Sequence, residues 1–128
     1  MAVKLLNAVI LAEDFVAVRD WWVAALGLEI HKEWPDLPYA DLAGEGGIML
    51  GIGTLATADV DPPSPRRNSV LPQFVSDDVE RLLARVVEHG GTIVFGPNFA
   101  EDGGYWYGSF ADIEGNPAWV VSPEAVPE

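Results

Sequence analysis

The sequence predicts an α+β fold made of two β-α-β-β-β modules in tandem, and three observations support this prediction. A shift of 64 residues superimposes the two halves of the 128-residue chain, so that Asp14 falls on Asp78 and Gly27 on Gly91. Each half contains one segment with the apolar period of an amphipathic helix. Short apolar runs bounded by Gly and Pro, which are typical of strands, follow each helical segment. A repeat at one fixed spacing indicates two copies of one structural unit.

In the first half, the apolar run at residues 5–12 predicts a buried strand, since it ends far short of a membrane span. The following helix has Asp14 near its start and Gly27 as its stop. Further strands are expected at residues 29–34, 39–42 and 48–52, with a hairpin turn at 44–47. The predicted apolar face of the helix consists of Phe15, Val18, Trp22, Ala25 and Leu26.

In the second half, the apolar period predicts a helix over about residues 78–89. Asp77 and Glu80 fit a capping box at its start, and Gly90-Gly91 fits its end. Further strands are expected at residues 92–95, 105–110 and 118–121. We assign one domain over residues 1–128, with modules at about 3–55 and 70–122 and a Pro-rich surface linker at 56–69.

Composition excludes several classes of function. The formal charge of -13 repels phosphate backbones and anionic lipids, so we expect neither a nucleic acid nor a membrane partner. The same charge either attracts a cationic ligand or is an ordinary solvated surface. The absence of Cys excludes disulfides, a thiolate nucleophile and Cys-bound zinc, and it fits a cytoplasmic location.

An ordered series of motifs resembles the glyoxalase/bleomycin resistance protein/dioxygenase superfamily, the vicinal oxygen chelate proteins. In the first half, these are Asp14-Phe15, the pair Trp21-Trp22 and L-G-L-E-I at residues 26–30. In the second half, they are D-D-V at 77–79, G-G followed by Pro at 90–97 and D-I-E-G-N-P at 112–117. The resemblance covers residues 3–122. It implies curled mixed sheets around a concave pocket, and a homodimer.

The resemblance also implies a divalent metal held by His or Gln on the first strand of each half and by Glu on the last. Asn7 and Leu71 occupy the first-strand positions, with Gln73 as the nearest alternative ligand. Trp119 stands in place of one Glu, and the other falls at residues 48–51, at Met49 or Leu50. Because these side chains offer no imidazole or carboxylate, we expect no metal or other cofactor.

Other side chains offer weaker metal sites. We interpret His31 as a surface residue among glutamates and His89 as a residue facing the negative end of a helix. A site of carboxylates alone, using Asp41, Glu101 or Asp102, is an alternative. No spacing of residues identifies a catalytic group.

The predicted ligand-binding positions are those that the resemblance places around the pocket, together with an aromatic strand. Trp119 either lines this pocket or plugs it. The aromatic run at 105–107 puts rings on both faces of its strand, where they either bind a ligand or fill the core and a dimer seam. Trp34 and Asp41 are weaker candidates of the same kind, and strand alternation adds Val9 and Gln73 to the pocket wall. The predicted ligand-binding residues are Asn7, Met49, Leu71, Gln73, Tyr105, Trp106, Tyr107 and Trp119.

Together these features predict metal-independent binding or sequestration of a small aromatic or cationic organic molecule, as in the antibiotic-resistance members of the superfamily that the chain resembles. The alternative is a lyase, isomerase or dioxygenase of the glyoxalase type, acting on a small molecule with or without a divalent metal. A third hypothesis is a scaffold without a ligand that acts through its interfaces.

Overall fold

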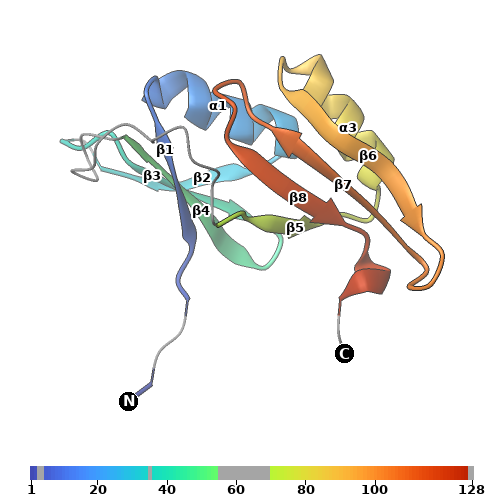
Figure 1. Cartoon of the computed structure of the whole chain (residues 1–128). Coiled ribbons are helices and arrows are strands. Elements are labelled where there is room, and N and C mark those ends of the chain that lie inside the picture. The colour runs from blue at the N-terminus through green and yellow to red at the C-terminus, as the bar shows by residue number, and fades with distance from the viewer. Residues whose placement is uncertain (3–4, 35, 55–69, 127–128) are drawn as a thin grey trace. The chain divides into compact units, whose positions relative to one another are not determined.

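The chain folds as two compact units, Met1–Pro65 and Arg66–Glu128, and the described residues of each form one four-stranded mixed sheet and one α-helix (Figure 1). The computed structural model describes residues 1–2, 5–34, 36–54 and 70–126. The predicted linker at 56–69 lies outside these ranges, and the assignment of one domain stays a prediction. Neither helix in the described ranges is both long and apolar enough to cross a membrane.

The first unit has the element order β-α-β-β-β. It consists of β1 (Ala8–Ala12), α1 (Phe15–Leu26), β2 (Glu29–Glu33), β3 (Ala40–Gly44) and β4 (Gly47–Thr54). The sheet order is β1-β4-β3-β2, in which β1 is parallel to β4 and the other pairs are antiparallel.

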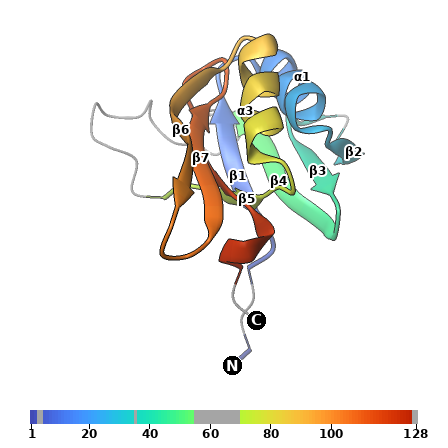
Figure 2. The same cartoon turned by 90° about the vertical axis from the view of Figure 1, so that its right-hand side faces the viewer.

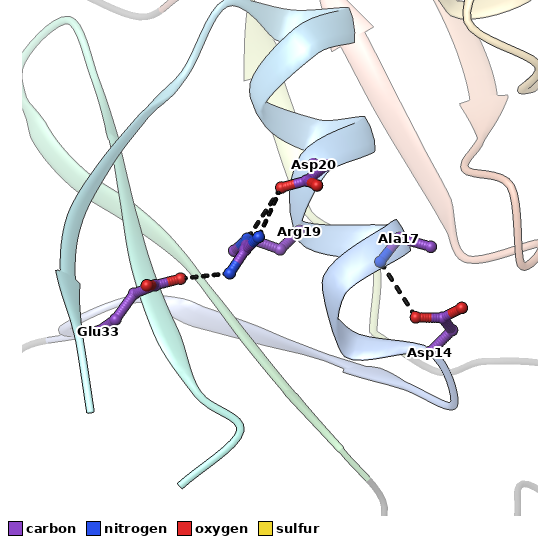
Figure 3. Close-up of polar contacts among 5 residues, drawn as sticks. All are labelled: Asp14, Ala17, Arg19, Asp20 and Glu33. Carbon is purple, nitrogen blue, oxygen red and sulfur yellow. Dashed lines mark hydrogen bonds and ion pairs between the residues drawn. The ribbon is translucent and has the colours of Figure 1, made fainter. Parts of the chain in front are cut away.

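Local sequence signals set both ends of α1. The Asp14 carboxylate accepts a hydrogen bond from the backbone N–H of Ala17 at 3.1 Å, which satisfies a free donor of the first turn (Figure 3). Gly27 ends the helix at φ 68°, a conformation that costs glycine little. Both ends are as predicted. The buried face also includes Trp21, which the predicted stripe omitted; its members are Val18, Trp21, Trp22 and Ala25.

The predicted strand at residues 5–12 is wrong for its first three residues. Leu5 and Leu6 are 86% and 71% exposed, and β1 begins at Ala8. Its pairing with β4 also begins there, opposite Leu50. Next to Leu50, a β-bulge interrupts the pairing of β3 with β4. The bulge bends β4, which is the strand that residues 5–7 would have to pair with to extend β1.

The second unit repeats this topology. It consists of β5 (Gln73–Val75), α3 (Val79–Glu88), β6 (Thr92–Ala100), β7 (Tyr105–Ala111) and β8 (Pro117–Val121). The sheet order is β5-β8-β7-β6, with one parallel pair in the same place as in the first unit. The two units therefore confirm the tandem modules. A short 3₁₀ helix at Pro123–Ala125 follows β8.

The cap of α3 differs from the prediction by one residue. Asp78, not Asp77, is the N-cap, and its carboxylate accepts from the backbone N–H of Arg81 at 3.0 Å. The Asp78 N–H in turn donates to Ser76 Oγ, so the capping box of Asp77 and Glu80 is wrong. The predicted end is confirmed, because Gly90 adopts φ 91° and lets the chain close the last turn.

Strand β6 continues to Ala100, well beyond the predicted end at residue 95. β6 is the edge strand of its sheet, so no strand pairs with its outer side. Pro97, which has no backbone N–H, therefore breaks no hydrogen bond on that side. Gly96 makes this passage feasible, since a β-carbon there would lie 2.8 Å from the carbonyl oxygen of Tyr107. Bulges in the pairing with β7 absorb the extra residues.

Candidate functional site

Each sheet has one face that packs against the helix of its own unit and one that does not. In the first unit, Ala40, Leu42, Leu50 and Ile52 are fully buried on the face toward α1. In the second unit, α3 runs beside β6 and β7, as Figure 2 shows. We call the opposite face of each sheet its helix-free face. The predicted site residues are best judged by which of these faces they occupy.

On the helix-free face of the first unit, Asn7, Tyr39 and Asp41 form a hydrogen-bonded cluster. The Tyr39 hydroxyl donates to Asp41 Oδ1 at 3.0 Å, and Asn7 Nδ2 donates to the same oxygen at 3.2 Å. Asn7 Nδ2 also lies 3.4 Å from the Tyr39 hydroxyl oxygen. All three side chains are partly buried. The cluster joins the chain before β1 to β3 across β4.

Gly51 makes room for this cluster. It pairs with both Val9 and Asp41, so its missing side chain would project from the helix-free face. A β-carbon at Gly51 would collide with the Tyr39 hydroxyl. The phenol therefore occupies the space that a side chain of β4 would fill.

The described residues of the first unit do not supply the ligands of the metal site implied by the resemblance. Asn7 stands in the position of a His, and its amide hydrogen bonds to Asp41. The β4 position on the same face is Gly51, which has no side chain to offer. A single carboxylate that already accepts two hydrogen bonds is a poor substitute for imidazole and glutamate ligands.

Neither Met49 nor Leu50, the predicted pocket-wall positions of β4, belongs to the cluster of Asn7, Tyr39 and Asp41. Leu50 is fully buried on the face toward α1. Met49 falls in the β-bulge, and its side chain covers Gly44 next to the buried Leu28. The bulge shifts the alternation by one residue, which puts Gly51 on the helix-free face instead.

On the helix-free face of the second unit, Gln73, Trp119 and Ser109 lie side by side on β5, β8 and β7. Tyr105 and Tyr107 continue this face along β7, with ring centroids 6.1 Å apart. Trp119 is 44% exposed, so it is not a core plug of the described chain. These side chains supply an aromatic surface, in which Trp119 is exposed and the two tyrosines are half-buried, together with the exposed amide of Gln73. Leu71, half-buried, precedes β5 and is not part of the strand.

The structure separates Trp106 from the other predicted aromatic residues. Alternation along β7 places it on the face of Gly108 and Phe110, which α3 covers through Leu83. Its ring packs beside Phe99, with centroids 5.1 Å apart, and it is 44% exposed. Trp106 and Trp119 are thus equally exposed tryptophans on opposite faces of one sheet.

The alternative metal ligands are also dispersed. His31 is exposed on β2, and His89 is the exposed C-cap of α3. Asp41 belongs to the cluster with Tyr39, whereas Glu101 and Asp102 lie in the exposed turn between β6 and β7. Within the part of the chain that the structure describes, no three His, Asp or Glu side chains converge as metal ligands would.

Sequence reasoning missed Tyr39 and Gly51. Tyr39 and Asp41 are two residues apart, a spacing that puts side chains on one face of a strand and could have signalled their contact. No local signal marks Gly51, because its role depends on the register of β1, β3 and β4.

Burial raises the pKa of Tyr39, and the nearby Asp41 raises it further, whereas the Asn7 amide lowers it. Unfolded tyrosine ionises near pH 10, so the unfolded chain releases its proton before the folded chain does. The stability that the folded chain gains from the protonated Tyr39 is fully present below about pH 10. It is lost as the pH rises toward the higher pKa of Tyr39 in the folded state. We expect urea unfolding to show a steeper loss of stability between about pH 9 and pH 11 in the wild type than in Tyr39→Phe. Equal losses would contradict the raised pKa.

In the described residues, each unit pairs one α-helix with a four-stranded sheet of the same strand order, which defines a glyoxalase-like tandem fold. The sequence matches the glyoxalase-like domain family over residues 7–121, and the chain belongs to this family. No curated protein matches the chain.

Solved structures share the fold at low sequence identity. A glyoxalase/bleomycin resistance protein/dioxygenase family enzyme from Burkholderia phytofirmans PsJN has a TM-score of 0.73 and 16% identity, over 91% of this chain and 95% of that one. TioX from Micromonospora sp. ML1 has a TM-score of 0.70 and 20% identity, over 94% and 98%. A glyoxalase/bleomycin resistance protein from Albidiferax ferrireducens T118 has a TM-score of 0.70 and 18% identity, over 92% and 97%.

Proposed function

We propose that this protein binds a small aromatic or cationic organic molecule without a metal ion, using the helix-free face of its second unit. The observation that carries the proposal is Trp119. It stands where the resemblance implies a metal-binding Glu, and it is 44% exposed on a face that its own helix does not cover. An exposed indole at that position suits a planar or cationic ligand better than a metal.

The neighbours of Trp119 support this proposal. Gln73 pairs with it on the adjacent strand and supplies a polar group that can orient a ligand. Tyr107 lies diagonally across the β7–β8 pair, at a spacing that aromatic side chains bridge. The net charge of -13 favours a cation over an anion at any such surface.

A thermal-shift screen of aromatic and cationic compounds tests the proposal, and at least one compound is expected to raise Tm. Affinity for that compound should fall roughly tenfold in Trp119→Leu, the loss of about 1.4 kcal/mol of stacking. Trp106→Leu is the matched control, because that tryptophan is equally exposed on the other face. An equal loss in both variants would contradict the assignment of the face.

Metal analysis of protein purified without chelator tests the proposal that binding needs no metal ion. A stoichiometric content of zinc, nickel, iron or manganese would overturn metal-independent binding and favour the enzymatic alternative. A content far below one ion per chain is the expected result.

A further inference from the structure

The first unit contains a pocket that shares no lining residue with the face proposed above. Its volume is about 550 Å³, and it lies among α1, the end of β2 and the segment before β3. This volume is within the range of about 300–1,000 Å³ that is usual for small-molecule sites. The aromatic residues Phe15, Trp34 and Tyr39 line it, together with the charged residues Arg19, Glu33 and Asp36.

The charge of Arg19 is already neutralised. Its Nη1 lies 2.6 Å from Glu33 Oε1, and its Nη2 lies 2.9 Å from Asp20 Oδ1 (Figure 3). The guanidinium carbon lies 5.4 Å from the ring centroid of Phe15. Burial alone would lower the pKa of Arg19, but the two carboxylates raise it overall. Arg19 is therefore a fixed wall of the pocket and does not offer an unpaired cation to an anionic ligand.

The remaining charge of the pocket is negative. Asp36 is exposed, and within the described residues it forms no ion pair. Lys32 places its ammonium 4.6 Å from the ring centroid of Trp34. This distance is within the range of a cation–π interaction, so the indole face is accessible to a cation. Tyr39 meets Trp34 edge to face, with centroids 5.2 Å apart, so the two rings form a fixed aromatic corner.

We propose that this pocket binds an arylalkylamine, with its ring against Trp34 and Tyr39 and its ammonium toward Asp36. A neutral aromatic would gain the ring contacts alone. An aromatic carboxylate would meet Asp36 and the already paired Arg19, so we expect no binding.

The test is an NMR titration of the ¹⁵N-labelled protein with tryptamine, with its neutral analogue tryptophol and with indole-3-acetate. For a probe of this size we expect a Kd on the order of 1 mM for tryptamine. The shifts should include the side-chain N–H signals of Trp34 and Arg19. Tryptophol should bind about fivefold more weakly, and indole-3-acetate should leave the spectrum unchanged. Equal binding of all three probes would overturn recognition of the ammonium.

Substitutions locate the site. Asp36→Asn should weaken tryptamine about fivefold, whereas Asp102→Asn, the same change in an exposed turn of the second unit, should have no effect. Lys32→Met removes the competing cation and should tighten tryptamine about two- to fivefold. All three changed residues are exposed, so none of the changes should prevent folding.

Trp119→Leu separates this proposal from the proposed function. Binding of tryptamine to the pocket should be unchanged in this variant. If tryptamine instead shifts the Trp119 signal and loses affinity in Trp119→Leu but not in Asp36→Asn, the pocket proposal is overturned and the proposed function is supported. A loss in Asp36→Asn alone supports the pocket.

Discussion

Replacing Trp22 with Ala is expected to lower the free energy of unfolding by about 3–5 kcal/mol. Trp22 is fully buried on α1, and its ring meets Trp21 edge to face with centroids 5.1 Å apart. Truncation removes the largest fully buried side chain of the described residues and leaves a cavity that neighbouring groups fill only in part. Urea unfolding followed by circular dichroism measures the loss.

Trp106→Ala is the control for this prediction. Trp106 is 44% exposed and contacts Phe99 at the sheet surface, so its loss should cost about 1 kcal/mol or less. Equal losses in the two variants would mean that burial does not determine the contribution of these tryptophans.

Asp112→Ala is expected to cost about 2 kcal/mol, the second large effect. The buried carboxylate accepts hydrogen bonds from the backbone N–H groups of Glu114 and Asn116, both at 2.9 Å, and from Asn116 Nδ2 at 2.8 Å. It thereby fixes the turn between β7 and β8, in which Gly115 adopts φ 87°. Alanine leaves these donors without their acceptor.

Asp112→Asn distinguishes the contributions of the two carboxylate oxygens to the free energy of unfolding, measured by the same urea unfolding. Its remaining carbonyl oxygen can still accept from the two backbone donors, so about half of the loss is expected. Asp102→Ala, in an exposed turn, should change stability by less than about 0.5 kcal/mol. If Asp112→Ala is as mild as Asp102→Ala, the carboxylate does not hold the turn.

The structural role of Asp112 also explains why the family could be recognised while the site could not. The D-I-E-G-N-P motif encodes a turn that any member of the fold can use, whatever it binds. The positions that differ in chemistry, Asn7 and Trp119, carry no motif of their own. The match to the glyoxalase-like domain family therefore establishes the fold and leaves the ligand to experiment.

Predictions based on neighbouring residues were accurate where the cause was local. The ends of α1 followed from Asp14 and Gly27, because caps and left-handed residues act within one turn. The N-cap of α3 was harder to predict, because Asp77 and Asp78 are adjacent candidates. The direction of the backbone decides which carboxylate reaches the free N–H groups of the helix. Of the predicted ligand-binding residues, Gln73, Tyr105, Tyr107 and Trp119 share one face, and their role in binding stays a prediction.

The sequence by itself determined the two tandem modules, their helices and the alternation that divides Tyr105 and Tyr107 from Trp106. These depend on periods of two and 3.6 residues and on turn chemistry within a few positions. Only the tertiary structure decided which face each helix covers and which residue of β4 faces Asn7. A single bulge moved that position from Met49 or Leu50 to Gly51 and admitted the Tyr39 hydroxyl. The reason is that strand register depends on pairing between distant segments, and one extra residue reverses every side chain beyond it.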